Sequence, residues 1–238
     1  MKISIVSNDE RYIYLNEILN EAGFDSKICE INELDSPEVV ILSVRKEHSD
    51  KELEEIFSRV SPSTLVISPY SVKNPNCLVY DYTRGEAFLK KNAYLTAEGA
   101  ICLYYNTVKE TLQGKKIAVL GYGRIGKYLS KMLKNQGASV FVYARRKEVR
   151  TEAELDGYYS LEIDEIPLTI DAIFNTVPDE IYKNKTNAHL FELASKSGFS
   201  YKENVISGAG LPGKMFPKTA AEYIYEEIKP ILTFQERT

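Results

Sequence analysis

A glycine-rich hexapeptide is the clearest candidate for chemistry in this sequence. GYGRIG places Gly121, Gly123 and Gly126 at GxGxxG spacing, between the apolar run IAVL and a segment with Leu129 and Leu133 at helical spacing. In such a strand–turn–helix unit the glycines permit a tight turn, close approach of the backbone to a pyrophosphate and close packing of the helix. We therefore predict a dinucleotide site, with a turn that binds nothing as the alternative. The residues predicted to hold the pyrophosphate are Gly121, Gly123, Arg124, Ile125 and Gly126.

The end of the next apolar run predicts which dinucleotide binds. An NAD site usually carries Asp or Glu about 20 residues after the glycines, where the carboxylate binds the ribose hydroxyls. Here the run ends in YARRK, so Arg145, Arg146 and Lys147 stand where that acid is expected. These cations suit a 2′-phosphate, which Arg binds as a planar fork. The sequence therefore favours NADP over NAD, with a solvated strand end as the alternative.

The segment NTVP is predicted to lie on the nicotinamide side of the same site. It ends a later apolar run, and ligands of doubly wound sheets lie beyond the carboxyl ends of strands. We therefore expect Thr176, Val177 and Pro178 to flank the nicotinamide. A β-turn started by Pro178 and Asp179 explains the same residues equally well.

Two further segments carry candidate substrate residues. TAEG is expected to open a long helix, so that Thr96 or Glu98 points towards the junction of two domains, although helix capping explains both. GLPGKMFPKTAAE combines a rigid glycine–proline loop with a helix that begins at Pro217 and has Lys218 and Thr219 in its first turn. A cation is electrostatically unfavourable there, and such a conflict often marks a functional position. Together with the free N–H groups of the helix it would suit a carboxylate.

Composition and charge exclude several classes of function. The chain has 238 residues, of which 44% are hydrophobic, and a net charge of −4, so no nucleic-acid partner is expected. The three cysteines are far apart and form no CxxC, which predicts neither a metal site nor a disulfide framework. No apolar run approaches the roughly 20 residues of a membrane span, and the first residues soon become polar, unlike a signal peptide. We therefore expect a cytoplasmic protein with no membrane partner.

Histidines are scarce. A 2-hydroxy-acid dehydrogenase usually needs a His, polarised by a carboxylate, to take the hydroxyl proton. The chain contains only His48 and His189, and neither is expected near the nicotinamide. An NADP-dependent 2-hydroxy-acid or amino-acid dehydrogenase is thus an alternative rather than the leading hypothesis.

The elements expected around these motifs indicate an α/β protein. Short apolar runs alternate with helical patterns, which predicts two doubly wound domains joined by a long helix over residues 96–112. The first is expected to be flavodoxin-like and to span residues 1–94, with a C-terminal helix in 218–238 packing back on it. The second, residues 95–217, is expected to be an NADP-binding Rossmann domain. Strands are expected at 2–6, 26–31, 38–44, 64–68, 77–82, 117–120, 139–143, 171–178, 189–195 and 204–210.

Several segments together resemble one family, the dipicolinate synthase A proteins of spore-forming bacteria. They are TAEGAI, GKKIAVLGYGRIGKYL, YARRK, IFNTVP, ELAS and GAGLPGKMFPKTAAEYI. SNDERYIYLNEIL also resembles that family's opening segment, in which Asp-x-Arg follows the first strand, here Asp9 and Arg11. The likeness is strong from residue 92 onward and weak across residues 25–90, and the chain is shorter than typical members.

The resemblance implies an NADP-dependent oxidation of a dihydrodipicolinate-type ring to dipicolinate for sporulation, in the mother-cell cytoplasm. It also implies a small dicarboxylate substrate, and its implied partner is a flavin-binding B subunit. Loss of a hydride and a proton makes the ring aromatic, so no His is needed to deprotonate a hydroxyl. The residues expected to face the substrate are Thr96, Glu98, Lys218 and Thr219, with Glu98 handling the proton. A non-catalytic nucleotide-binding component of a flavoprotein complex is a further alternative, and a homo-oligomer is left open.

Overall fold

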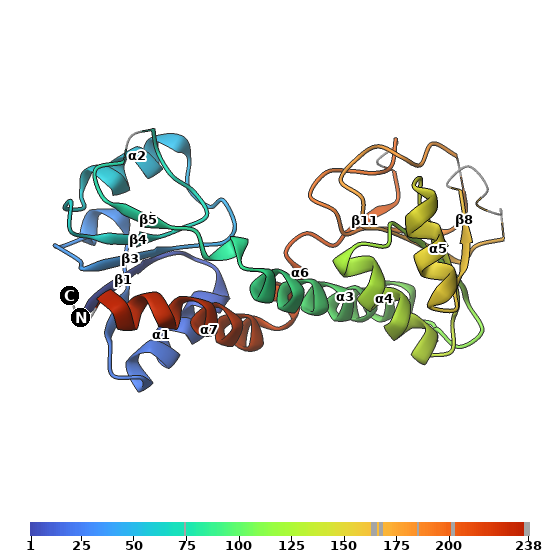
Figure 1. Cartoon of the computed structure of the whole chain (residues 1–238), viewed down its shortest axis with the longest axis horizontal. Coiled ribbons are helices and arrows are strands. Elements are labelled where there is room, and N and C mark those ends of the chain that lie inside the picture. Colours follow the sequence, from blue (N-terminus) through green and yellow to red (C-terminus); the bar gives the residue numbers. More distant parts are fainter. Residues whose placement is uncertain (74, 163–165, 167–168, 185, 201–202, 236–238) are drawn as a thin grey trace. The chain divides into compact units, whose positions relative to one another are not determined.

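The chain folds into two compact units. The computed structural model describes residues 1–73, 75–162, 166, 169–184, 186–200 and 203–235. The first unit comprises residues 1–92 and 216–238, and the second comprises residues 93–215. Each contains one parallel sheet with its helices, which confirms the predicted α/β class (Figure 1). The chain passes between the units within α3 (Glu86–Val108) and again between α6 (Leu211–Met215) and α7 (Pro217–Gln235).

The first unit is built on a five-stranded sheet in the order β2-β1-β3-β4-β5. This is the flavodoxin-like order, as predicted, and the direction of winding reverses between β1 and β3. All four neighbouring pairs run parallel. The strands are β1 (Lys2–Val6), β2 (Asp25–Ile28), β3 (Val39–Leu42), β4 (Leu65–Ile67) and β5 (Leu78–Tyr80).

Helices cover both faces of this first sheet. The helix α1 (Glu10–Glu21) begins at the N-cap Asp9, and α2 (Asp50–Ser58) begins at a capping box formed by Ser49 and Glu52. Alternate strand residues, such as Ile3 and Ile5, pack with α1 and α7, while their neighbours pack with α2. The C-terminal helix thus completes the core of the first unit. Two short 3-10 turns, Ile31–Glu33 and Tyr82–Arg84, complete the secondary structure of this unit.

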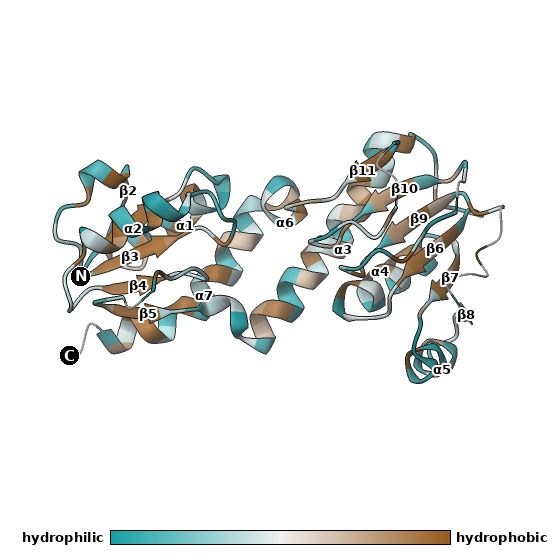
Figure 2. Ribbon diagram, turned by 90° about the horizontal axis from the view of Figure 1, so that it is seen from above, coloured by the Kyte–Doolittle hydropathy of each residue, from teal (hydrophilic) through white to brown (hydrophobic). Residues whose placement is uncertain are grey.

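The second unit is built on a six-stranded parallel sheet in the order β11-β10-β9-β6-β7-β8. Counted from its own first strand, this is the Rossmann order 3-2-1-4-5-6 read in reverse, as predicted. Its central strands are hydrophobic along their length, whereas α5 is largely hydrophilic (Figure 2). The elements are β6 (Lys116–Leu120), α4 (Arg124–Asn135), β7 (Ser139–Tyr143), α5 (Lys147–Leu155), β8 (Tyr159–Leu161), β9 (Ala172–Asn175), β10 (His189–Glu192) and β11 (Val205–Ser207).

The predicted start of the long helix is wrong. The helix α3 begins at Glu86, directly after Gly85, so Thr96 and Glu98 lie within it rather than in its first turn. KKNAYL looked like a turn, but it contains no Gly or Pro and therefore continues the helix. The end of the helix also differs, because Lys109 takes a φ of 61° and stops it well before Gly114.

The prediction of a rigid loop at GLPGK is also wrong, because these residues belong largely to the short helix α6. The helix α6 packs against α3 at Gly99, where an added Cβ would lie 3.0 Å from the Cβ of Leu211. The glycine of TAEG therefore allows α6 to pack closely on α3 within the second unit. The helix α5 and the strand β8 were not predicted from the sequence.

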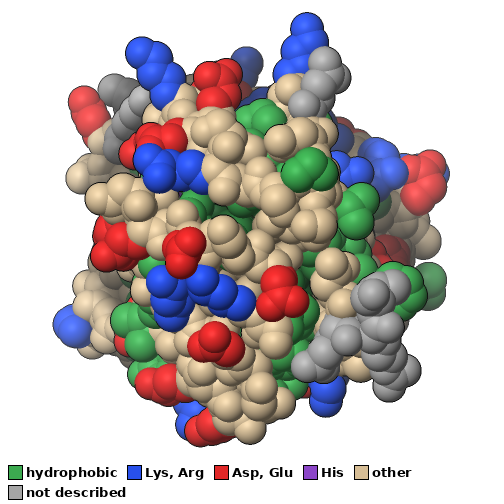
Figure 3. Space-filling view, turned by 90° about the vertical axis from the view of Figure 1, so that its left-hand side faces the viewer, with side chains coloured by type: hydrophobic (Ala, Val, Ile, Leu, Met, Phe, Trp, Pro, Cys, Tyr) green, Lys and Arg blue, Asp and Glu red, His purple; other side chains and the backbone are tan. Residues whose placement is uncertain are grey.

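Acidic and basic side chains are interspersed on one face of the molecule. On the face viewed from the left-hand side of Figure 1, acidic and basic side chains lie next to one another rather than in separate patches (Figure 3). That mixture is unlike the continuous basic surface that a nucleic-acid backbone favours. Among the helices of the described ranges, none has the length and apolar character needed to cross a bilayer.

Candidate functional site

The glycine turn lies at the carboxyl end of β6, at the start of α4. Gly121 takes a φ of 92°, a conformation that strongly favours glycine, and its N–H donates to the Tyr143 carbonyl oxygen at 2.8 Å. A Cβ on Gly126 would lie 2.2 Å from the Gly121 oxygen, so only glycine allows the helix to begin so close to the turn. These two glycines are required by the protein's own packing.

Gly123 differs from the other two glycines. Its φ of −83° is accessible to any residue, and a Cβ built on it meets no protein atom within 4 Å. No contact within the described chain therefore requires glycine here. The open space lies at the N-cap of α4, where free N–H groups favour an anion. The turn thus fits a pyrophosphate that approaches the backbone at Gly123.

The NTVP segment lies beside the glycine turn, because β9 pairs with β6. The Thr176 hydroxyl donates to the Leu120 carbonyl oxygen at 2.8 Å. Its Oγ1 and a methyl carbon of Val177 each lie 2.7 Å from where a Cβ on Gly121 would stand. The structure therefore brings the residues predicted for the pyrophosphate together with those predicted for the nicotinamide.

A buried hydrogen-bond network, not predicted from the sequence, stabilises the NTVP segment. Asn175 is fully buried, and its Nδ2 donates to Glu192 Oε1 at 2.7 Å and to the Val177 carbonyl oxygen at 2.9 Å. The Glu192 carboxylate also accepts the N–H groups of Ala194 at 2.9 Å and Gly198 at 2.7 Å. It thereby fixes the loops after β9 and β10 together. Polar residues that end apolar runs, as in IFN and FE, were the available signal.

Tyr122, between the first two glycines, ties the turn to α5. Its ring is buried, and its hydroxyl donates to Asp156 Oδ2 at 2.6 Å. Burial and the Asp156 carboxylate raise the pKa of Tyr122 far above its usual value, so the phenol stays protonated and remains a donor. Tyr122 is thus a positioning residue for the turn that the GxGxxG pattern alone does not reveal.

The cationic segment follows β7 in the same unit. Arg146 is the N-cap of α5 and Lys147 is its first residue, and all three cations are exposed. Arg145 Nη2 lies 3.1 Å from Asp179 Oδ2, an acid supplied by the loop after β9. The sequence places no acid at the end of β7, but the fold brings one next to Arg145. Because this pair is exposed, it holds Arg145 only weakly.

An acidic substitution tests the cationic segment. Arg145→Glu should weaken NADP by about 100-fold and NAD by only a few fold, because a charge-assisted phosphate contact is replaced by repulsion. Both affinities are to be measured by calorimetry. Lys131→Glu, which changes an exposed cation on α4, is the matched control and should affect neither nucleotide. Equal losses of affinity for NADP and for NAD would show that Arg145 does not bind the 2′-phosphate.

The four residues predicted to face the substrate lie in both units. Thr96 and Glu98 are in the second unit, on α3, where Thr96 is buried and Glu98 half-buried. Lys218 and Thr219 are in the first unit, in the first turn of α7, as predicted. The roles of these four residues remain predictions.

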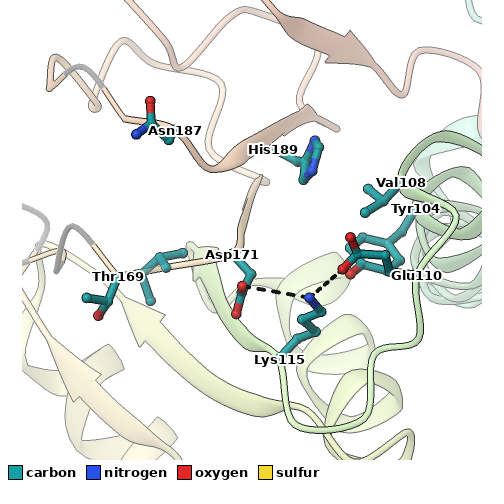
Figure 4. A pocket seen from close by; sticks show the side chains of 9 residues that line it. Tyr104, Val108, Glu110, Lys115, Thr169, Asp171, Asn187 and His189 are labelled. Carbon is teal, nitrogen blue, oxygen red and sulfur yellow. Dashed lines mark hydrogen bonds and ion pairs between the residues drawn. The ribbon is translucent and has the colours of Figure 1, made fainter.

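A separate cavity of about 330 Å³ lies at the amino-terminal edge of the second sheet (Figure 4). In this cavity Lys115 forms ion pairs with Glu110 and with Asp171, and its Nζ lies 3.9 Å from Asp171 Oδ1. His189 lies on the other side of the cavity (Figure 4). Ligands of doubly wound sheets bind at the opposite edge, so His189 is not at the nucleotide site. In the first unit, His48 Nε2 lies 3.2 Å from the Val6 carbonyl oxygen. Within the described ranges, no three His, Cys, Asp or Glu side chains gather to hold a metal ion.

Comparisons with known proteins agree with this geometry. Residues 111–205 match a family model described as the NADPH-binding domain of acetohydroxy acid isomeroreductase. The chain is 31% identical over 157 residues to the dipicolinate synthase A protein of Bacillus subtilis (strain 168), a match that covers 59% of this chain and 53% of that protein. The match thus spans about half the length of that curated relative.

Solved structures share the whole fold. The dipicolinate synthase A protein of Bacillus halodurans matches with a TM-score of 0.80 at 20% identity, over 97% of each chain. Its counterpart from Bacillus subtilis matches with a TM-score of 0.74 at 20% identity, over 100% of this chain and 97% of that one. The D-lactate dehydrogenase of Escherichia coli matches with a TM-score of 0.62 at 13% identity, over 99% and 97%. The predicted resemblance to the dipicolinate synthase A proteins is thus confirmed in sequence and in fold.

Proposed function

We propose that the chain is an NADP-dependent oxidoreductase of the dipicolinate synthase A type, which oxidises a dihydrodipicolinate-type ring to dipicolinate during sporulation. The proposal of a nucleotide site rests on Gly123. No contact within the described residues requires glycine at this position, which leaves close approach of a pyrophosphate as the reason for it. The likeness to the dipicolinate synthase A proteins supports the substrate.

The proposed cofactor residues divide into three groups. The backbone of residues 121–126 holds the pyrophosphate, the cations of residues 145–147 hold the 2′-phosphate, and residues 176–178 border the nicotinamide. Tyr122 and Glu192 position the first and last of these groups through Asp156 and Asn175. When bound, NADP⁺ accepts a hydride, so the dihydro ring loses a hydride and a proton and becomes the aromatic dicarboxylate.

The substrate residues follow from the charges that this reaction involves. Lys218 and Thr219, at a helix start with free N–H groups, suit a carboxylate of the substrate. Glu98 is proposed to take the ring proton. Thr96, two residues earlier on α3, is also proposed to face the substrate. The resemblance further suggests that the partner is a flavin-binding B subunit.

Co-expression with a flavin-binding B subunit tests the proposed function. Purified complex supplied with a dihydrodipicolinate precursor and NADP⁺ should form dipicolinate, detected by chromatography, and an equal amount of NADPH. Lys218→Ala should raise the KM for the precursor about tenfold or more without changing NADP affinity. Dipicolinate formed without NADPH would reject NADP as the oxidant. NADP binding without any turnover would favour a non-catalytic role.

A further inference from the structure

The first unit has its own polar edge at the carboxyl ends of β1 and β3. The order of its sheet reverses between these two strands, which is where doubly wound sheets bind ligands. The segment after β1 supplies Asp9 and Arg11, and the segment after β3 supplies Arg45. None of these residues is required for the nucleotide site described above.

Arg11 is a buried cation whose guanidinium has N–H donors that are not used in hydrogen bonds with described residues. Its Nε and Nη2 donate to the two oxygens of Asp9 at 2.8 and 2.6 Å, and only 4% of its side chain is exposed. Burial would lower the pKa of the guanidinium, but Asp9 outweighs it, so the charge is retained. Its Nη1 forms no hydrogen bond with any residue that the structure describes. A buried guanidinium normally uses all its donors, so two N–H groups are left for a ligand.

Arg45 adds a second cation next to this pair. Arg45 lies on the segment after β3, and Glu47 of the same segment accepts the Ser7 hydroxyl and the Asn8 N–H from the loop that carries Asp9. The charge of Arg45 also contributes to the lowered pKa of Asp9. Two other cations of the first unit, Lys46 and Arg84, are paired with Asp50 and Asp81. Arg45 itself is exposed and forms no ion pair within the described ranges. It is therefore available to an anion that reaches this edge.

The main chain that carries Arg45 is fixed in place. The Tyr12 hydroxyl accepts the Val44 N–H at 2.7 Å and lies 2.7 Å from the Tyr82 hydroxyl, while the Tyr70 hydroxyl donates to the Val44 oxygen at 2.9 Å. Burial raises the pKa of Tyr12 to about 12, so this hydroxyl network stays protonated at neutral pH. A preorganised backbone of this kind favours binding because little entropy is lost on association.

Another acid at this edge, Glu47, is held by hydrogen bonds to the loop after β1. Glu47 Oε2 accepts the Ser7 hydroxyl at 2.9 Å and the Asn8 N–H at 3.1 Å. Those two bonds hold its carboxylate against the loop after β1. Asp9 is bonded to Arg11, and among the described residues no hydrogen bond or ion pair joins Asp9 or Glu47 to the Arg45 guanidinium.

We propose that Arg45, together with Nη1 of Arg11, binds a carboxylate group of the substrate at the carboxyl edge of the first sheet. A planar carboxylate matches the fork of a guanidinium, whereas Lys would offer only a point charge. The identity of that carboxylate, one of the two on a pyridine-type ring, rests on the proposed function. The site itself rests on the two arginines.

Ligand binding to the intact chain tests this site. Pyridine-2,6-dicarboxylate and pyridine-2-carboxylate are titrated into protein saturated with NADP, and heat is measured. Arg45→Gln should weaken both about 10- to 100-fold, the loss expected for one charge-assisted pair, and leave NADP affinity unchanged. Arg59→Gln, which removes an exposed Arg at the end of α2, is the matched control and should change neither.

The outcomes separate this site from the proposed function. If no dipicolinate is formed but carboxylates bind in an Arg45-dependent way, the site stands and the function fails. If dipicolinate is formed and Arg45→Gln leaves its KM and the carboxylate affinities unchanged, the site is overturned and the function stands. If the wild-type chain binds neither carboxylate at millimolar concentration, the site is likewise overturned.

Discussion

Gly123→Ala should weaken nucleotide binding strongly while leaving the protein folded. A methyl group at this position meets no protein atom within 4 Å, and the backbone there is accessible to alanine. Replacing glycine by alanine at an N-cap costs about 1 kcal/mol or less, so the melting temperature should hardly change. The methyl would occupy the path by which a pyrophosphate approaches the turn. We expect the Kd for NADP to rise by about 100-fold or more, equivalent to about 2.7 kcal/mol.

Gly126→Ala provides the contrast. Its Cβ would lie 2.2 Å from the Gly121 oxygen, a backbone atom that can move only if the turn moves. We expect this variant to lose about 1–3 kcal/mol of stability, as in other overpacked sites, as well as nucleotide affinity. Thermal unfolding and NADP calorimetry on both variants distinguish the two effects. Unchanged NADP affinity in Gly123→Ala would show that the turn does not hold a pyrophosphate.

Asp9→Asn should strongly destabilise the first unit. The side chains of Asp9 and Arg11 are 6% and 4% exposed, and removing one charge leaves the Arg11 guanidinium buried without its partner. Breaking a buried ion pair costs about 3–5 kcal/mol, whereas Asn still caps α1. The amides of β1 and β3 should exchange their hydrogens faster in this variant, because the free energy of unfolding of the first unit is lower. Asp50→Asn is the control: its pair with Lys46 is exposed, so the change should be about 1 kcal/mol or less.

The contribution of Asp9 should also depend on pH in a defined direction. Burial alone would raise the pKa of its carboxyl, but the hydrogen bonds and charge of Arg11 outweigh it, and the pKa is lowered. A lowered pKa in the folded state means that the stabilisation is present above the ordinary Asp value of about 3.9 and is lost as the pH falls below it. The difference between wild type and Asp9→Asn should therefore shrink below about pH 4. A difference that stays constant as the pH falls below about 4 would contradict a charge-based role.

Sequence patterns predicted most strands of this protein because parallel strands buried on both faces are continuous apolar runs. VVIL in β3 and KIAVL in β6 are examples, and both end at polar or glycine residues. The glycine turn was equally predictable, since its context fixes its geometry. The start of α3 was not, because KKNAYL has no residue that stops a helix and its polar character resembles a loop.

The parts of the site that sequence did not reveal depend on contacts between distant segments. Asp179 meets Arg145, Asn175 meets Glu192, and Asp156 meets Tyr122 only after the sheet has formed. No local spacing links these residues, which are brought together by strand order. A search for polar residues at the ends of buried strands would have found Asn175 and Glu192.

The two-part first unit has a consequence for synthesis of the protein on the ribosome. Its core needs Ala221, Ile224, Ile228 and Leu232 of α7 as well as α1 and the first sheet. Residues 93–215 emerge between these parts and form a complete unit of their own. The nucleotide-binding unit can therefore finish folding during translation, while the apolar face of α1 waits for α7. During that interval the nascent chain exposes a surface that a chaperone would recognise.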